Sequence, residues 1–333
     1  MSSFGLTTFG DISPRVGIYA VARFLDHASY VQTLERYARI EPLPKNKGQV
    51  VKFRRFVPFE INTTALVEGV TPAPNMLQFE DVTAVISQYG QWTTFTDVIA
   101  DTHEDPVLQN ITAGLGEVAG AVKEQLIWAE LLGGTNVIYS GAATQRSEVE
   151  EPISEAELIA AQRFLKASRA KPLTRMLRAG TGIATEPVAP GYIAFGHSNL
   201  EPDLRALPNF VPREKYSQAQ YISEYELGKF QDIRFILTPD LWPIYGAGGA
   251  DVDGVISRDG AAADVYPLVI VGQDAYGVVP MRGMDSVRVV VKNPTHTFED
   301  PLAQRGFASW KMWYVAVRLN EEWMVRIEAA ASA

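Results

Sequence analysis

Side chains that could perform chemistry are present in this chain, but their spacing fits no catalytic motif. His103 is followed by a glutamate, as at the start of the zinc-peptidase motif, yet Val107 stands where the second zinc-binding histidine should be. The Gly-His-Ser-Asn run around Ser198 resembles a nucleophile elbow, but Leu200 replaces its final glycine. A hydrolase that uses Ser198 or His103 is therefore the weaker interpretation, and a cap on the turn after Ser198 is the stronger one.

Metal and cofactor sites are not predicted either. The four histidines lie far apart, and the chain has no cysteine, which excludes disulfides and thiolate ligands. Asp251 and Asp253 supply only two acids of a calcium loop. The glycines at positions 114, 116 and 120 lack the dinucleotide-binding period, and no Walker loop occurs. We predict a protein that is not an enzyme and that needs no metal or small cofactor.

Composition sets limits on the possible functions. A chain of 333 residues predicts about two domains with a sizeable core. The net charge of −9 argues against general nucleic-acid binding, which normally needs a basic face. The N-terminus does not resemble a signal peptide, and no apolar run approaches the roughly 20 residues of a membrane span. We therefore expect a soluble protein that is intracellular when made and has no membrane partner.

Residues Lys45 to Asp97 are predicted to form an arm, which is one long β-hairpin and the most informative element for function. Five bases precede its first acid, Glu60, on the outgoing stretch: Lys45, Lys47, Lys52, Arg54 and Arg55. The return stretch carries acids and no base: Glu68, Glu80, Asp81 and Asp97. An isolated hairpin is marginal in water, and its open edges invite pairing with another chain. The arm therefore predicts an assembling structural protein.

Two helices are predicted after the arm. Asp105 is a good N-cap for a helix from Pro106 to Leu132, whose apolar residues recur at helical spacing: Leu108, Ile111, Leu115, Val118, Val122, Leu126 and Leu131. Its three internal glycines indicate either a closely crossing backbone or a tolerated weakness. Ser154 and Glu157 form a capping box for the second helix, which ends before Pro172.

Short strands dominate the rest of the chain. A short amphipathic run from Val21 to Ile40 precedes the arm, and the acids at 148, 150 and 151 are predicted to lie in a solvated linker. Strand-like segments begin near Gly191 and end in two strands with packed aromatic residues: Trp310, Trp313, Tyr314 and Trp323. Helices followed by mixed strands predict an α+β fold.

A series of segments, taken in order, carries a family resemblance: KGQVVKFRRF, ALVEGVTP, VTAVISQYGQWTTFTDVIADTHEDPVL, FILTPDLW, DPLAQRGFASWKMWY and NEEWMVRIE. Together they resemble the major capsid proteins of tailed bacteriophages, and the nearest group is the family typified by an N-four-like podophage of Escherichia coli. The resemblance extends from about residue 45 to residue 328. It is most specific in the block that leads into the Asp105 helix and in the C-terminal tryptophan strands.

The resemblance implies a fold similar to that of the Hong Kong 97 phage capsid protein. Residues 1–44 would be the N-terminal arm, and 45–100 the extended loop that reaches across a neighbouring subunit. Residues 101–190 would form a peripheral domain with the spine helix, 191–284 an axial domain, and 285–333 the strands that complete the peripheral domain. The strand order could be standard or permuted.

The function implied by the resemblance is self-assembly into the icosahedral head of a double-stranded DNA phage. Its partners would be further copies in hexamers and pentamers, a separate scaffolding protein, a portal and possible cementing proteins. The shell would enclose DNA without sequence-specific binding and would be assembled in the bacterial cytoplasm. An encapsulin-like shell is the alternative, and it would differ by containing cargo protein instead of DNA.

The charges of the arm are the predicted contact residues between subunits. Lys52, Arg54 and Arg55 would face acids of an adjacent subunit, and the arm would offer complementary charge at three positions: Glu60, Glu68 and Glu80. Solubilising charges on an exposed strand are the alternative interpretation.

Overall fold

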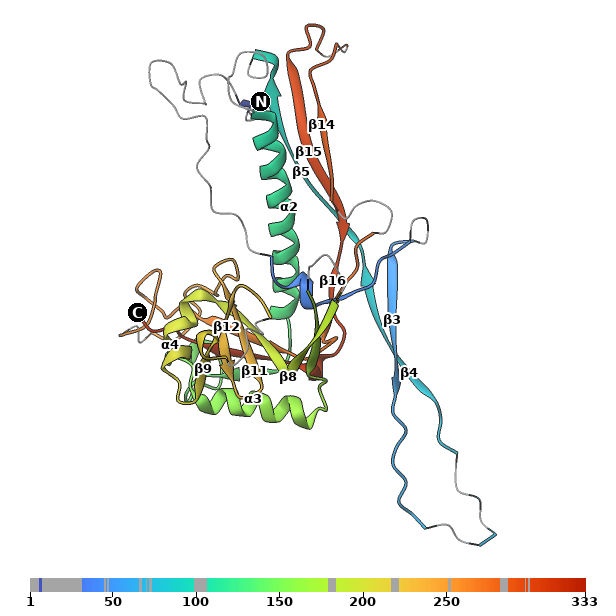
Figure 1. The fold of residues 1–333 in the computed structure, drawn as a ribbon, viewed down its shortest axis with the longest axis vertical. Helices are drawn as coiled ribbons and strands as arrows, with labels where there is room; N and C mark the ends of the chain where they lie inside the picture. The colour runs from blue at the N-terminus through green and yellow to red at the C-terminus, as the bar shows by residue number, and fades with distance from the viewer. Residues whose placement is uncertain are drawn as a thin grey trace.

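The structure is a computed structural model. It describes residues 6–7, 32–44, 46, 48–65, 68–69, 71, 74–98, 107–178, 184–216, 222–250, 253–281, 287–296, 298 and 300–333. The described residues form three parts, which Figure 1 shows as a column of one long helix beside long strands, a globular body below it, and an extended hairpin at one side. The run from Val21, together with His103, Asp105 and Asp251, lies outside the described residues or only partly within them.

The column is built around helix α2 (Val107–Leu132), where a helix from Pro106 is predicted. It ends as predicted, since the N–H groups of Gly133 and Gly134 turn back to the carbonyls of Glu130 and Leu131. The fully buried positions include Ile127 and Trp128, which are not in the predicted stripe. Near its C-terminal end, the helix is therefore buried over a wider part of its circumference than the predicted stripe indicates.

The glycines of α2 support the close-crossing hypothesis at one position only. A Cβ at Gly120 would collide with the side chain of Gln32, whereas a Cβ at Gly114 or Gly116 would meet nothing within 4 Å. The crossing group is a side chain, not a backbone. At the other two positions the described part of the chain leaves open space.

A four-stranded sheet lies along α2, with the order β1 (Leu6–Thr7), β5 (Ser87–Thr96), β15 (Arg305–Tyr314) and β14 (Val287–Lys292). Burial alternates strictly along β15, where Ala308, Trp310, Met312 and Tyr314 are buried and their neighbours are not. One face of this sheet therefore packs on α2, and the other is open.

The body contains an eight-stranded sheet. Its order is β6 (Val137–Tyr139), β17 (Met324–Ala329), β12 (Tyr266–Val271), β8 (Ala184–His197), β11 (Ile233–Thr238), β10 (Glu226–Phe230) and β9 (Phe210–Pro212), with β7 (Leu173–Arg178) paired to β8. Along β12, Leu268 and Ile270 join the core under helix α3 (Glu155–Ala167), while Val269 and Val271 join the core that contains Trp128. The sheet is therefore buried on both faces, by α3 on one side and by the end of α2 on the other.

Helix α3 begins as its sequence predicts, because Ser154 and Glu157 form both halves of a capping box. The body also contains the short helix α4 (Glu201–Ala206) and a three-stranded sheet of β16 (Ala316–Arg318), β13 (Tyr276–Val278) and β2 (Arg39–Ile40). Five 3₁₀ turns complete the described elements: η2 (Glu35–Tyr37), η3 (Arg146–Glu148), η4 (Ser198–Leu200), η5 (Arg213–Lys215) and η6 (Glu321–Trp323).

The arm is shorter than predicted. Strands β3 (Val50–Val57) and β4 (Gln78–Val85) pair along their whole length, but β5 leaves the hairpin and pairs with β15. The reason is visible at the break, where Ala84 and Ile86 are buried with Leu43 and Val279 at the root of the arm. The chain is anchored there, so residues 87–96 belong to the column.

The C-terminal strands also divide differently from the prediction. Strands β14 and β15 lie beside α2, as expected for strands that complete the helix domain. Strand β17 instead inserts between β6 and β12 in the body, and α3 packs on the body sheet as well. Strand pairing thus assigns 155–167 and 324–329 to the body, although both segments were predicted to lie with the long helix.

Candidate assembly surfaces

The register of β3 and β4 sets the arm's bases against its own acids. Arg54 lies opposite Asp81 and donates to both carboxylate oxygens, at 2.7 and 3.0 Å, while Arg55 donates to Glu80 at 2.7 Å. The pKa of Asp81 is lowered, mainly because Arg54 donates a hydrogen bond to its carboxylate. Both arginines are thus paired inside the arm of a single chain.

The six predicted contact residues do not form one cluster. Lys52 lies opposite Thr83, and Glu60 and Glu68 are exposed beyond the paired strands. Side chains alternate along a strand, so Lys52 and Arg54 share one face of the hairpin and Arg55 lies on the other. The contacts predicted for the arm would therefore involve both faces of the hairpin. Two further bases of the arm, Lys45 and Lys47, are not among the described residues.

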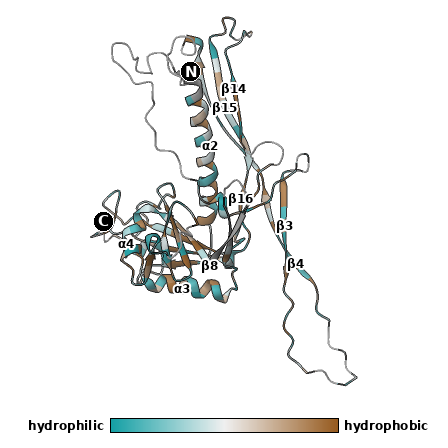
Figure 2. Cartoon of the chain, in the orientation of Figure 1, coloured by the Kyte–Doolittle hydropathy of each residue, from teal (hydrophilic) through white to brown (hydrophobic). Residues whose placement is uncertain are grey.

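The arm also carries large apolar side chains that are mostly exposed to solvent. Ile61 is 84% exposed and Met76 80%, and further large apolar residues lie beside them: Phe56, Phe59, Leu77 and Phe79. Figure 2 shows hydrophobic and hydrophilic positions interspersed along β3 and β4. Large apolar side chains exposed together on an extended element are typical of a protein–protein contact.

The open face of the column is basic. Alternation along β14 and β15 directs four exposed cations away from α2, and they define what we call the cationic face: Arg288, Lys292, Arg305 and Lys311. No ion pair joins any of the four to another described residue, and the strand positions on this face hold no acid. Trp92 and Phe307 lie on the same face, 56% and 36% exposed. The surface suits a partner that is acidic and apolar.

A groove of about 1010 Å³ separates the root of the arm from the body. Its walls carry six bases and four acids: Arg39, Lys52, Arg54, Arg55, Arg169 and Lys171, with Glu41, Glu80, Asp274 and Glu322. The groove is open and lined from separate elements, as a space between two protruding parts of a subunit would be. It contains no cluster of convergent catalytic groups.

The residues of the hydrolase hypothesis have structural roles where they are described. Ser198 begins η4, and the ring of His197 caps that turn by accepting the N–H of Asn199 at 3.0 Å. Burial lowers the pKa of His197, which favours the neutral ring. The cap therefore comes from His197 and not from Ser198 or Asn199, and no hydrogen bond between Ser198 and His197 is present. The described part of the chain contains no group of three potential metal ligands and no helix long and apolar enough to cross a membrane.

The N-terminal segment is fastened to α2 by a buried carboxylate. Glu124 accepts the N–H groups of Thr33 and Leu34 and the hydroxyl of Thr33, each at 2.9 Å. Burial raises the pKa of Glu124, and the three donors oppose that rise. The last residues of the predicted N-terminal arm are thereby held against the column.

Comparison with known proteins places these surfaces in context. The sequence model described as phage capsid protein matches residues 80–327, which is more than half of the chain. This chain belongs to the phage capsid protein family. The major capsid protein of Pseudomonas phage KPP21 is 26% identical over 265 residues, covering 74% of this chain and 66% of that protein. The chain thus spans slightly less than two thirds of that relative's length.

Solved phage capsids share the fold of this family member. The capsid of Ralstonia phage GP4 superposes with a TM-score of 0.69 at 12% identity, covering 98% of each chain. The head structure of Helicobacter pylori bacteriophage KHP40 gives 0.66 at 12% identity and 96% of each chain. These likenesses confirm the predicted α+β fold of the Hong Kong 97 type.

Sequence reasoning missed the cationic face entirely. Two of its bases lie on β14 and two on β15, with Glu299 and Asp300 between the two strands in the sequence, and only the register of β14 with β15 brings the four together. A signal was available in the alternation of β15, where Arg305, Phe307 and Lys311 fall on the opposite parity from the buried Trp310. The partner strand could not have been named from that pattern.

Proposed function

We propose that this chain is a major capsid protein, without catalytic activity, whose copies assemble into the icosahedral head of a tailed double-stranded DNA phage. The observation that carries this proposal is the arm, a two-stranded hairpin whose exposed apolar side chains are not covered by any described part of the chain. Obligate interfaces commonly bury about 2,000 Å² or more, and such contacts would stabilise it. Family membership and the shared fold support the same function.

The cationic face is the surface that best fits the arm of an adjacent copy. From Phe56 to Val122 the sequence has no lysine or arginine, and the distal arm offers Glu60 and Glu68 beside exposed Phe59 and Ile61. That chemistry complements the four cations of the cationic face, which no other described residue pairs with, and Trp92 and Phe307 beside them. Opposite charges would set the register of the contact, and the apolar side chains would supply most of its free energy.

The proposed assembly has further parts. Copies would gather in hexamers and pentamers, with the body as the axial domain and the column as the peripheral domain. A scaffolding protein, a portal and cementing proteins are the partners we expect, in the cytoplasm of the bacterial host. The DNA would be enclosed without sequence-specific contacts. Lys52, Arg54, Arg55, Glu60, Glu68 and Glu80 remain our proposed contact residues on the arm.

The test is negative-stain imaging of the purified protein, expressed with and without the phage's scaffolding protein. We expect closed particles for the wild type and none for the variant Arg288→Glu/Lys311→Glu, while Arg205→Glu, on the remote helix α4, should assemble. A stable monomer of the wild type over a wide range of concentration and salt, even with scaffold, would refute the proposal. Particles from infected cells should contain DNA, whereas cargo protein would indicate an encapsulin-like shell.

A further inference from the structure

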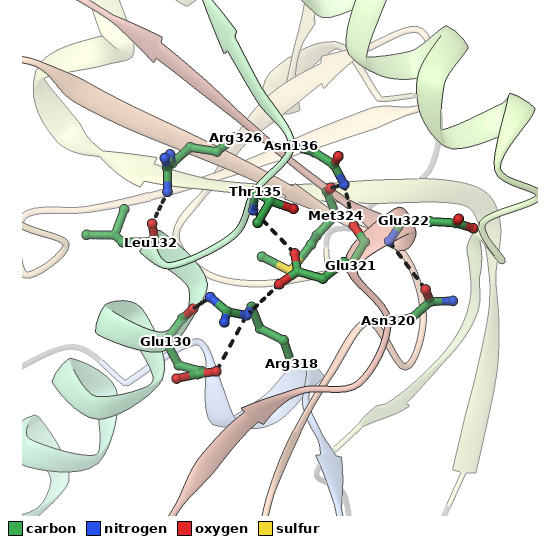
Figure 3. Close-up of polar contacts among 10 residues, drawn as sticks. All are labelled: Glu130, Leu132, Thr135, Asn136, Arg318, Asn320, Glu321, Glu322, Met324 and Arg326. Carbon is green, nitrogen blue, oxygen red and sulfur yellow. Dashed lines mark hydrogen bonds and ion pairs between the residues drawn. The ribbon is translucent and has the colours of Figure 1, made fainter. Parts of the chain in front are cut away.

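The C-terminal end of α2 is held by two arginines from the strands on either side of η6 (Figure 3). Arg318, at the end of β16, donates to the carbonyl of Glu130 at 3.2 Å. Arg326, in β17, donates to the carbonyl of Leu132. The last carbonyls of a helix have no partner within the helix and carry its negative pole, so cations are favoured there.

Buried charge around Arg326 is balanced by this pole. Glu328 is fully buried and lies 2.7 Å from both Arg326 and Arg146. Two cations thus face one carboxylate, and the carbonyl end of α2 supplies the remaining negative potential. Burial lowers the pKa of Arg326, and Glu328 opposes that effect. The helix end and the body sheet therefore stabilise each other's charges.

Arg318 joins the same helix end to the turn between the two strands. Its guanidinium lies 2.8 Å from the carboxylate of Glu321 and 3.5 Å from that of Glu130. Asn136, just beyond the helix, donates to the carbonyl of Glu321 at 2.7 Å. Hydrogen bonds and ion pairs thus connect the end of α2 to the strand β16 and to the turn η6.

We propose that Arg318 and Arg326 are positioning residues that fix the angle at which the column leaves the body and so set the curvature of the shell. This inference rests on the proposed function. The apolar contacts of Ile127, Trp128 and Leu131 hold the helix end in the body, but apolar packing is not directional. Hydrogen bonds to the terminal carbonyls are directional, so they define the tilt.

The length of α2 makes a small tilt large at the other end. Its 26 residues span about 39 Å, so a tilt of about 5° moves the far end by about 3 Å. The cationic face lies on the column, and the body would make contacts of its own. A change in the angle between them therefore changes the direction from one subunit to the next in a closed shell.

Arg318 is the residue to test, because its side chain is 26% exposed, whereas Arg326 is buried and paired with the buried Glu328. The chain has no cysteine, so Ala113→Cys on α2 and Ala167→Cys on α3, both exposed, give two unique spin-label sites. We expect Arg318→Gln to widen the distance distribution between these labels in the unassembled subunit. Assembled particles should lose their uniform diameter or form tubes, and Arg318→Lys should restore part of both.

Arg205→Gln is the control, since it removes an arginine that is 43% exposed from its pair with Glu201, away from the C-terminal end of α2. It should keep a narrow distance distribution and particles of wild-type diameter. Unchanged distances and diameters in both Arg318 variants would overturn the inference while leaving the proposed function intact. Failure of both Arg318 variants to fold would also overturn it, because Arg318 would then be needed for folding itself. Failure of the wild type and the control to assemble would instead refute the proposed function.

Discussion

The body and the arm of this subunit bury their apolar residues in opposite ways. In the body sheet every residue of β11 and β12 is buried, and both faces are covered by other parts of the same chain. In the arm only Ala84 of the two paired strands is buried. The apolar residues of these strands are thus buried by the chain itself in the body and mostly exposed in the arm. The chain covers the body sheet by itself, and we propose that a neighbouring copy covers the arm.

The largest predicted effect compares one phenylalanine from each region. Phe235→Ala should lower the free energy of unfolding of the unassembled subunit by about 3–5 kcal/mol, because the side chain is fully buried in the body. Phe59→Ala should leave that free energy nearly unchanged, because the ring is 49% exposed on the arm. Denaturant unfolding of both variants measures the difference, and light scattering should show that Phe59→Ala nevertheless weakens assembly. Equal losses of stability would contradict the division between the two regions.

A smaller effect on stability, but a clear one on assembly, is predicted for the charges of the arm. Lys52→Glu, Arg54→Glu and Arg55→Glu together should leave the melting temperature close to that of the wild type, because ion pairs that are exposed to solvent contribute little to stability. The triple variant should form no closed particles under the electron microscope, since several weak contacts repeat in every subunit. Normal assembly at physiological salt would show that these bases are not contact residues.

The triple variant also breaks two pairs inside the arm, so it needs a control. Exchanging the partners, with Arg54→Asp and Asp81→Arg together with Arg55→Glu and Glu80→Arg, keeps both cross-strand pairs. If the variant with exchanged pairs also fails to assemble, the neighbouring subunit contacts these charges and requires each sign at its position. If it assembles normally, the pairs serve only to hold the hairpin together.

Local elements of the fold could be predicted from the sequence because their signals are local. The end of α2 at Gly133 and the capping box at Ser154 depend on residues within one turn, and both are confirmed. The glycine at position 120 indicated that another group crosses close to α2, but not which one. The crossing side chain belongs to Gln32, which is 88 positions away (120 − 32). The α+β fold followed from the order of the elements and from the family resemblance.

Strand pairing could not be predicted in the same way. The segment that becomes β5 has the same alternation whether it continues the hairpin or joins β15, and only the burial of Ile86 at the root decides. Strand β17 is buried on both faces although Arg326 and Glu328 lie on one of them, so its sequence alternates like that of a half-exposed strand and does not indicate its sheet. The role of the arm's charges as contact residues stays a prediction, and the pairs of Arg54 with Asp81 and of Arg55 with Glu80 could not be foreseen because they depend on the register of β3 with β4.

The smallest predicted effect concerns the point where the N-terminal segment meets the column. Burial raises the pKa of Glu124 above its ordinary value of 4.5, although three donors from Thr33 and Leu34 oppose the rise. Below about pH 4.5 the carboxyl is protonated in both the folded and the unfolded state, and its full contribution to stability is present. As the pH rises, the unfolded state loses its proton first, so this contribution declines until the pH has passed the raised pKa.

Melting temperatures of the wild type and of Glu124→Gln, measured across this range in the unassembled subunit, test the sign. The amide is neutral at every pH, so the variant lacks this titration. The melting temperature of the wild type relative to the variant should fall as the pH rises above about 4.5 and then level off. The opposite slope would show that the donors from Thr33 and Leu34 favour the ionised carboxylate more than burial disfavours it. The N-terminal segment would then be held by a charge, and its attachment to the column would weaken in acid.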